Sequence, residues 1–270
     1  MLGNALLDRD PLRNALLGAL PDIDWSRVRR SLQAVEAPAG MILCEPDARL
    51  AYAYFPTTSI ISIQRVSIDG SSTEVASVGH EGVFGITLVM GDDMTGSRAV
   101  VQHRGHMYRL RSELLIEEFS RGSAMQYLLL RYTRALLALI AQGAVCNQRH
   151  SIDQMLCRWI LLSLDRLASE ELTMTHELLA NTLGVRREGI TEAACRLQNA
   201  GLITYRRGRI TITDRQGLEA SCCECHGIVR REYARLLDPD AYERHNRSLA
   251  ANAHAVRGNC ASERSERVIA

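Results

Sequence analysis

The sequence predicts an α+β fold in which a β-rich part precedes a helical part. Three observations indicate this order. Short β-type runs broken by glycine or Asp-Gly occupy residues 39–111, proline is absent between Thr57 and Asp238, and helical periodicity dominates after residue 112. We therefore expect a small sandwich or barrel of strands, followed by helices.

The composition is that of an ordinary globular protein. The chain has 270 residues, enough for one large domain or two smaller ones, and it is 46% apolar and 23% charged. Its formal net charge is only +1, so any contact with a polyanion must come from local clustering of charge. All 32 basic residues are arginine, the better bidentate ligand for phosphate and guanine.

The sequence predicts a soluble, cytoplasmic protein without membrane contact. Its apolar start is interrupted by Arg9, Asp10 and Arg13, unlike a signal peptide. No run approaches the roughly 20 apolar residues that span a bilayer. The eight cysteines lack the regular spacing of a disulfide framework, and we expect reduced thiols.

Residues 26–119 are predicted to form the β-rich domain, after a helical lead-in over residues 1–25. The segments "YFPTTSIISIQRVSIDG" and "STEVASVGHEGVFG" alternate apolar and polar residues, as strands with one buried face do. Asp69-Gly70 is a strong hairpin signal, and Arg104-Gly105 marks a further turn.

Residues 120–147 are predicted to form one long helix. This stretch lacks proline, and its apolar residues recur at alternating intervals of four and three, which is a heptad seam. We expect the seam to form a homodimer interface while another apolar face packs on the chain's own strands. A buried core helix in a monomer is the alternative. The predicted interface residues are Met125, Leu129, Tyr132, Leu136, Leu139 and Gly143.

The stretch "LLANTLGVRREGITEAACRL", residues 178–197, has the pattern of a helix-turn-helix. Ala180 is the small residue where two helices cross, Gly184 can adopt a positive φ in the turn, and Thr175 can cap the first helix. The second helix has one apolar stripe at helical spacing, formed by Ile190, Ala193, Ala194 and Leu197. Residues 148–237 are assigned to this domain, which ends in a hairpin and a further helix. Residues 238–270 have the composition of a poorly ordered tail.

The outer face of the second helix carries the predicted DNA contacts, because the first turns of a recognition helix reach base edges. Base contacts are assigned to Arg187, Glu188, Thr191 and Glu192, and phosphate contacts to Thr175, Arg186, Arg206, Arg207 and Arg209. Six arginines and two glutamates between residues 186 and 209 give a local charge of +4. An amphipathic helical hairpin with a solvated charged face is the alternative.

This order of β-rich domain, long helix and winged helix-turn-helix resembles the Crp–Fnr superfamily of bacterial transcription regulators over residues 25–237. The most specific part is "MTHELLANTLGVRREGITEAACRLQNAGLI", in which Arg187 and Glu188 match the family's base-reading pair. Arg186 stands where members have a serine-like cap, and Glu192 where many have a basic residue. The resemblance implies a jelly-roll β-barrel sensor of the cyclic-nucleotide-binding type, a palindromic operator in double-stranded DNA, and RNA polymerase as a partner.

The resemblance also places the nucleotide cassette in "VFGITLVMGDDMTGSRAVV". Gly85, Arg98 and Ala99 match the cassette, but Ile86 replaces the glutamate that accepts from the ribose hydroxyl. An unpaired ribose hydroxyl costs about 1–3 kcal/mol, so we expect weak cyclic-nucleotide binding or none. The effector is unknown and no cofactor is expected. Arg98 then either binds another anion or is a surface residue.

No metal site is predicted. The family's iron–sulfur members carry an N-terminal cysteine cluster, whereas no cysteine precedes Cys44 here. Cys222, Cys223 and Cys225 stand next to His226, but adjacent cysteines cannot easily bind one ion, and we favour packing thiols over metal ligands.

We therefore expect a dimeric, sequence-specific DNA-binding regulator. A signalling adaptor that uses the β-rich domain to bind a partner is the alternative, although it would not need the arginine-bearing hairpin. An enzyme is not expected, because we find no phosphate-cradling loop, no nucleophile with a placed base and no metal pair.

Overall fold

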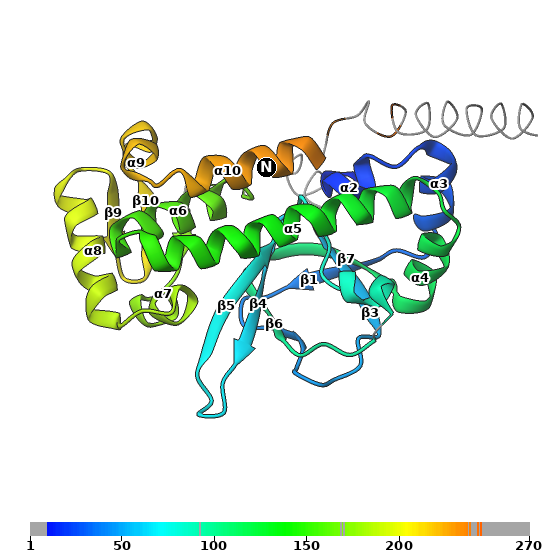
Figure 1. The fold of residues 1–270 in the computed structure, drawn as a ribbon, viewed down its shortest axis with the longest axis horizontal. Coiled ribbons are helices and arrows are strands. Elements are labelled where there is room, and N and C mark those ends of the chain that lie inside the picture. The colour runs from blue at the N-terminus through cyan, green and yellow to red at the C-terminus, as the bar shows by residue number, and fades with distance from the viewer. Residues whose placement is uncertain are drawn as a thin grey trace, which may run out of the picture. The chain divides into compact units, whose positions relative to one another are not determined.

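A computed structural model describes residues 10–91, 93–167, 169, 171–236, 238, 242 and 244 (Figure 1). The chain divides into two units, Met1–Leu236 and Leu237–Ala270, and every helix and strand named below belongs to the first. The start of the predicted lead-in, residues 1–9, and most of the predicted tail lie outside the described residues.

Three short helices form the described part of the lead-in: η1 (Pro11–Arg13), α2 (Ala15–Gly18) and α3 (Asp22–Val28). Asn14 fixes them to the β-rich domain. Its side chain caps α2, and its amide donates to the carbonyl oxygens of Pro56 and Gly82 at 2.9 and 2.8 Å. Because Asn14 is fully buried, these bonds satisfy polar atoms that water does not reach.

The β-rich domain consists of two antiparallel sheets that are not closed into a barrel. One sheet has the order β1-β7-β3 and the other β2-β6-β4-β5. The strands are β1 (Gln33–Ala37), β2 (Ile42–Cys44), β3 (Tyr52–Pro56), β4 (Ile60–Val66), β5 (Ser72–Val78), β6 (Arg98–His103) and β7 (Gly105–Arg111), with the short helix η2 (Ile86–Met90) between β5 and β6. The α+β class is confirmed, and of the two expected arrangements, sandwich or barrel, the two separate sheets correspond to the sandwich.

The predicted Asp69-Gly70 hairpin is confirmed between β4 and β5. Gly70 has a φ of 83°, and the Ser67 amide donates to the carbonyl of Ser71 at 2.8 Å. The Asp69 carboxylate accepts from the backbone amide of Ser71 at 2.9 Å, which is the local bond that makes aspartate common in turns.

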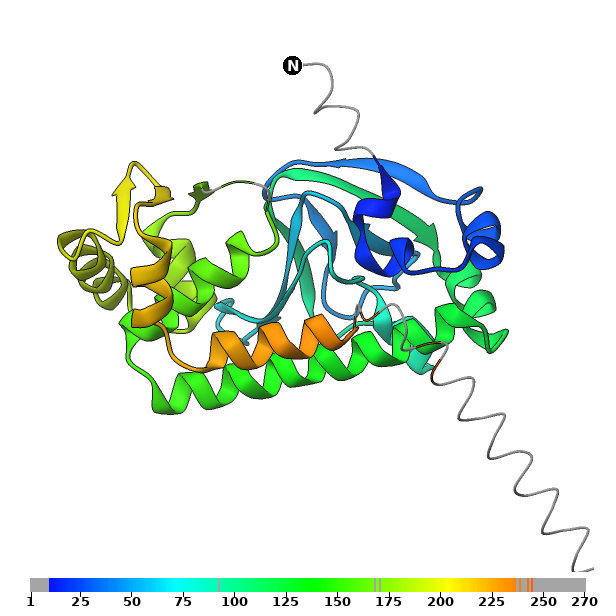
Figure 2. The ribbon, with the colours of Figure 1, turned by 90° about the horizontal axis from the view of Figure 1, so that it is seen from above.

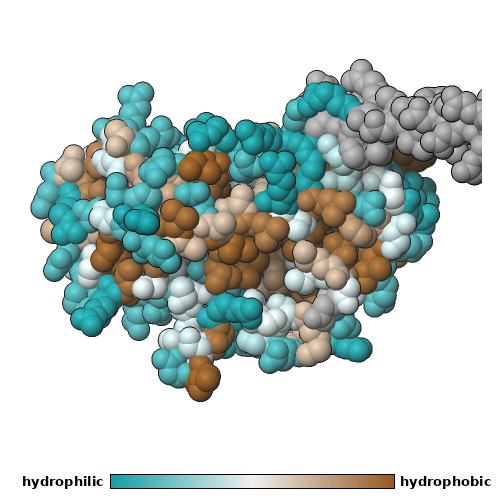
Figure 3. Space-filling view, in the orientation of Figure 1, coloured by the Kyte–Doolittle hydropathy of each residue, from teal (hydrophilic) through white to brown (hydrophobic). Residues whose placement is uncertain are grey.

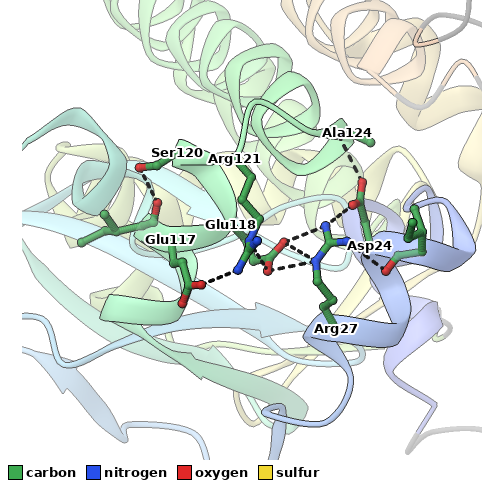
Figure 4. A network of polar contacts seen from close by, with 9 residues as sticks. Asp24, Arg27, Glu117, Glu118, Ser120, Arg121 and Ala124 are labelled. Carbon is green, nitrogen blue, oxygen red and sulfur yellow. Dashed lines mark hydrogen bonds and ion pairs between the residues drawn. The ribbon is translucent and has the colours of Figure 1, made fainter.

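A polar network joins the lead-in to helix α4 (Ser112–Ser120) and the start of helix α5 (Ala124–Arg149) (Figure 4). The Arg27 guanidinium binds Asp24 and, at 3.0 Å, Glu118. Glu118 also pairs with Arg121 at 3.1 Å. Asp24 accepts from the backbone amide of Ala124 at 3.2 Å, so a carboxylate from α3 caps the positive end of α5.

Helix α5 has 26 residues and is therefore about 39 Å long. It packs closely on the β-rich domain through Tyr132, which is fully buried. A Cβ atom at Gly82 would lie 2.3 Å from the Tyr132 ring, so only glycine fits there. Helix α10 (Cys225–Leu236) runs alongside α5 in both views (Figures 1 and 2).

Helix α5 also has the length and the mean hydropathy, 1.3, of a membrane-crossing helix, which we did not expect from the sequence. This is weak evidence for a membrane, because the core helix of a soluble protein has the same properties. Leu129 and Tyr132 pack inside the fold with no exposed surface, which favours the core-helix interpretation.

The C-terminal domain joins four helices and a three-stranded sheet around one core. Its elements are α6 (Ile152–Leu164), β8 (Glu171–Thr173), α7 (His176–Leu183), α8 (Arg187–Asn199), β9 (Ile203–Arg206), β10 (Arg209–Ile212) and α9 (Arg215–Ser221). The sheet has the order β8-β10-β9, so the predicted hairpin is extended by β8, a strand that the sequence did not predict.

Candidate nucleic-acid interface

The turn between α7 and α8 has the geometry of a helix-turn-helix. Thr175 caps α7, because its hydroxyl accepts from the Leu178 amide at 3.2 Å. Gly184 ends α7 with a φ of 67° and a ψ of 35°. The Val185 amide then donates to the carbonyl of Ala180 at 3.0 Å, a bond typical of helices that end on a left-handed glycine.

The predicted inner stripe of α8 is buried. Ile190 and Ala193 have no exposed surface, and Ala194 and Leu197 are at most 5% exposed. These side chains belong to the core that α6 and α7 share. Their burial fixes which face of α8 remains available to a partner.

The four residues assigned to base contacts lie on the exposed face of α8, within its first two turns: Arg187, Glu188, Thr191 and Glu192. Arg186 is the N-cap residue, is exposed, and makes no capping bond through its side chain. The Arg186 side chain is therefore not used to cap α8 and remains available to a partner.

Two of these residues also have partners inside the chain. The Thr191 hydroxyl donates to the Arg187 carbonyl at 3.1 Å, and Glu192 lies 3.7 Å from Arg196. Arg196 itself donates to both carboxylate oxygens of Asp153, at 2.8 and 2.6 Å. Arg196 is therefore held toward α6, although it adds to the basic charge that the sequence places here.

His176 and Tyr205 belong to this surface, and the sequence analysis did not single them out. Nδ1 of His176 lies 3.0 Å from the Thr191 hydroxyl, and its ring meets Tyr205 edge-on at 4.5 Å. Burial, and to a smaller extent the nearby charge of Arg187, lowers the pKa of His176, so its imidazole is neutral at pH 7. The sequence could have pointed to His176, because it directly follows the predicted helix cap Thr175.

The arginines of the hairpin β9–β10 differ in position and in their ion-pair partners. Arg207 and Gly208 form a two-residue turn with φ values of 51° and 76°, and Arg207 is exposed at its tip. Arg206 pairs across the ladder with Arg209. Arg209 forms an ion pair with Glu171 of β8 at 2.9 Å, so its charge is already partly balanced.

A hollow of about 410 Å³ lies between the start of α7 and the hairpin tip. Its walls include two cationic side chains, Arg187 and Arg207, and the capping residue Thr175. The helix N-terminus adds backbone amides and a positive partial charge. Glu177 also lines the hollow, so its walls carry two guanidinium groups and one carboxylate.

Five of the six residues predicted for the dimer interface face the chain's own core: Met125, Leu129, Tyr132, Leu136 and Leu139. The sixth, Gly143, is half-buried. The exposed apolar side chains of α5 lie on another face and are Leu130, Leu137, Ile140 and Val145, between 39% and 60% exposed. Figure 3 shows apolar side chains gathered over the middle of this helix. We call these four residues the α5 stripe.

The residues assigned to a possible effector have structural roles. Arg98 binds Glu45 at 2.8 Å, and Ala99 is fully buried. Gly85 has a φ of 106°, and a side chain there would crowd Ala53.

The cysteine-rich segment does not form the group that its sequence suggests. His226 lies away from its cysteine neighbours and places Nε2 2.8 Å from Asp165. Cys223 instead lies 3.7 Å from Cys146 of α5, and Cys225 lies 3.4 Å from His150. Two segments more than 70 residues apart in the chain therefore meet here.

Comparison with known proteins agrees with this geometry. Residues 154–221 match the family described as the Crp-like helix-turn-helix domain. The chain is similar in structure to FixK2 from Bradyrhizobium japonicum, with a TM-score of 0.59 and 16% identity over 71% of this chain and 98% of that one. It is also similar to TTHA1359, a transcriptional regulator of the CRP/FNR family from Thermus thermophilus, with a TM-score of 0.55 and 20% identity over 70% and 97% of the two chains.

A third similar structure is the c-di-GMP responsive global regulator CLP from Xanthomonas campestris, with a TM-score of 0.56 and 15% identity over 71% and 99% of the two chains. No curated protein matches the sequence. The helix-turn-helix domain and the fold are those of a DNA-binding transcription regulator. Residues 154–221 thus form the Crp-like helix-turn-helix domain that the sequence predicted, and the fold is similar to that of Crp/Fnr family regulators.

Proposed function

We propose that the protein is a cytoplasmic homodimer that binds a palindromic operator sequence-specifically and acts on RNA polymerase. The supporting observation is the exposed first turn of α8, which carries Arg187 and Glu188 on a rigid, buried frame beside a basic hairpin. A two-fold dimer would place two such helices in successive major grooves, about 34 Å apart.

Selection of bound duplexes from a random oligonucleotide pool tests this proposal. The expected result is enrichment of an inverted repeat whose half-site centres lie about 10 base pairs apart. An unenriched pool at low ionic strength would contradict the proposal, because a base-reading surface must favour some sequences over others.

Arg187 is proposed to read a base, with its guanidinium donating to guanine O6 and N7. Arg187→Ala should weaken binding to the selected duplex by about 1–3 kcal/mol and relax base choice at one position in each half-site. Competition binding with duplexes changed one base pair at a time measures this.

Arg196→Ala is the matched control for Arg187→Ala. Arg196 lies on the same helix and is exposed, but Asp153 holds its guanidinium. Base choice at the position assigned to Arg187 should be unchanged in this variant. If Arg187→Ala kept the full preference for the selected duplex, Arg187 would not be the base-reading residue.

Arg207 is proposed to bind a phosphate at the hairpin tip. Arg207→Ala should weaken binding to selected and scrambled duplexes alike. Each phosphate that the protein no longer neutralises should lower the slope of log K against log salt by about 0.9, which gives about 1.8 for a dimer. Arg209→Ala should change the slope less, because Glu171 already balances that charge. Equal effects of the two substitutions would refute this assignment.

The β-rich domain is proposed not to respond to cyclic AMP. Ile86 cannot accept from a ribose hydroxyl, and Arg98 already has the carboxylate partner Glu45. Calorimetric titration of the protein with cyclic AMP should therefore give no saturable heat in the micromolar range. A fitted site with micromolar affinity would show that the cassette still functions.

A further inference from the structure

Four metal-binding side chains converge at the C-terminal end of α5. Cys146 lies in the last turn of α5, and His150 is the C-cap residue that directly follows this helix. Cys223 precedes α10, and Cys225 is its first residue. One ligand atom from each of the four residues lies within 4.8 Å of every other.

Two of the distances between these atoms agree with the edges of a metal-centred tetrahedron, and all of them lie within 4.8 Å. Zinc bonds of about 2.3 Å to sulfur and 2.0–2.1 Å to nitrogen give edges of about 3.8 Å between two sulfurs and about 3.5 Å between sulfur and nitrogen. The Sγ atoms of Cys146 and Cys223 are 3.7 Å apart. Sγ of Cys225 and Nδ1 of His150 are 3.4 Å apart. A single ion can therefore reach these atoms without large movements.

The surroundings of the four ligands are those of a metal site. Cys146, Cys223 and Cys225 are at most 5% exposed. Nε2 of His150 lies 3.4 Å from a carboxylate oxygen of Glu224, so the ring presents Nδ1 to the cysteines and its other nitrogen to an acid. Histidine ligands are usually oriented by such a partner.

Gln142 supplies a further outer contact. Its Nε2 donates to Sγ of Cys225 at 3.0 Å. An amide donor aimed at sulfur stabilises a thiolate, which is the form of cysteine that binds a metal. Packing alone requires neither this donor nor the acid behind His150.

We propose that Cys146, His150, Cys223 and Cys225 bind one Zn²⁺ ion in a tetrahedral site. Three thiolates and one imidazole select a thiophilic ion, and four protein ligands leave no position open for catalysis, so the site is structural. The ion would join the start of α10 and the loop after α9 to the end of α5. It would therefore fix the C-terminal helices to the long helix.

This proposal differs from the expectation that the cysteine-rich segment only packs. Cys222 and His226 are not among the four proposed ligands. The site therefore does not require the adjacent residues Cys222 and Cys223 to bind the same ion. His226 is held by Asp165, while the two missing ligands come from α5 and its C-cap residue. The sequence alone could not reveal this set, since its two halves are more than 70 residues apart.

Titration of the reduced, metal-stripped full-length protein with Co²⁺ tests the proposal. One equivalent should bind per chain and produce the intense visible absorption of tetrahedral cobalt together with thiolate-to-metal charge transfer. One equivalent of Zn²⁺ should then bleach both signals. Protein purified under reducing conditions should contain one zinc per chain by elemental analysis.

Variants identify the ligands. Cys225→Ser and His150→Ala should lose the stoichiometric cobalt signal, whereas Cys222→Ser and Cys195→Ser should keep it. Glu224→Gln should bind about tenfold more weakly, because it removes only the orienting acid. Circular dichroism of each variant separates loss of metal from loss of fold, and the wild-type titration stands even if a ligand variant does not fold.

Three results would overturn the proposal. One is no zinc in the reduced protein and no cobalt signal after stripping. Another is loss of the signal in Cys222→Ser together with its survival in Cys225→Ser. The last is a Cys146–Cys223 disulfide in metal-free protein isolated without oxidant, which would assign the short sulfur–sulfur distance to redox chemistry instead.

Discussion

Leu137→Asp is expected to convert the proposed homodimer into monomers. Leu137 is 60% exposed and lies on the α5 stripe with Leu130, Ile140 and Val145. In a two-fold dimer of α5 helices, two copies of a charged side chain would be buried against apolar surface without partners, which is strongly unfavourable. Affinity for a palindromic duplex should fall by about 10²–10⁴-fold, because the second half-site no longer adds avidity.

Sedimentation velocity and duplex binding measure these two effects, and two control variants make them specific. Leu136→Asp changes the neighbouring residue, which is 8% exposed and faces the core, so it should unfold the chain rather than split a folded dimer. Ile68→Asp changes a fully exposed residue in the β4–β5 turn and should leave the dimer intact. If Leu137→Asp sedimented as a dimer at wild-type concentrations, the α5 stripe would not be the interface.

The sequence could not decide which face of α5 pairs with a second copy. Leu129 and Leu136 belong to one heptad seam, and Leu130 and Leu137 belong to the neighbouring one, which also contains Ile140. Periodicity identifies apolar faces but not what covers them. Only the placement of the sheets and α10, which depends on contacts distant in sequence, assigns the first seam to the core.

The helix-turn-helix could be predicted because its signals are local. The cap at Thr175, the turn at Gly184 and the stripe at Ile190 act within one or two helical turns. The partners of the arginines could not be predicted in this way. Glu171 lies 38 residues before Arg209 and meets it only because β8 joins the sheet.

The buried ion pair between Glu81 and Arg166 is the second site where one substitution should have a large effect. Nε of Arg166 lies 2.8 Å from the Glu81 carboxylate, and the two side chains are 6% and 8% exposed. Arg166 also donates to the hydroxyl of Ser77 at 2.6 Å. Burial alone would lower the pKa of Arg166, but Glu81 and other acidic neighbours outweigh it and raise the pKa, so the guanidinium stays charged.

Arg166→Met should lower the free energy of unfolding by about 3–5 kcal/mol, because it leaves the Glu81 carboxylate buried without a cation. The double variant Glu81→Gln/Arg166→Met should recover much of this loss, since neither charge then remains buried alone. Urea unfolding of the wild type, both single variants and the double variant measures the coupling between the two residues.

The unfolding measurements also test a contact between two domains, because Glu81 and Arg166 belong to different ones. Glu81 lies three residues after the end of β5 in the β-rich domain, and Arg166 lies two residues after α6, from which the chain continues to β8 and α8. An ion pair buried between them is a direct physical link between the β-rich domain and the DNA-binding domain. Strictly additive free energies in the four proteins would show that the two charges do not stabilise each other, and the link would then have to be carried by other contacts, such as those of α5 and α7 with β5.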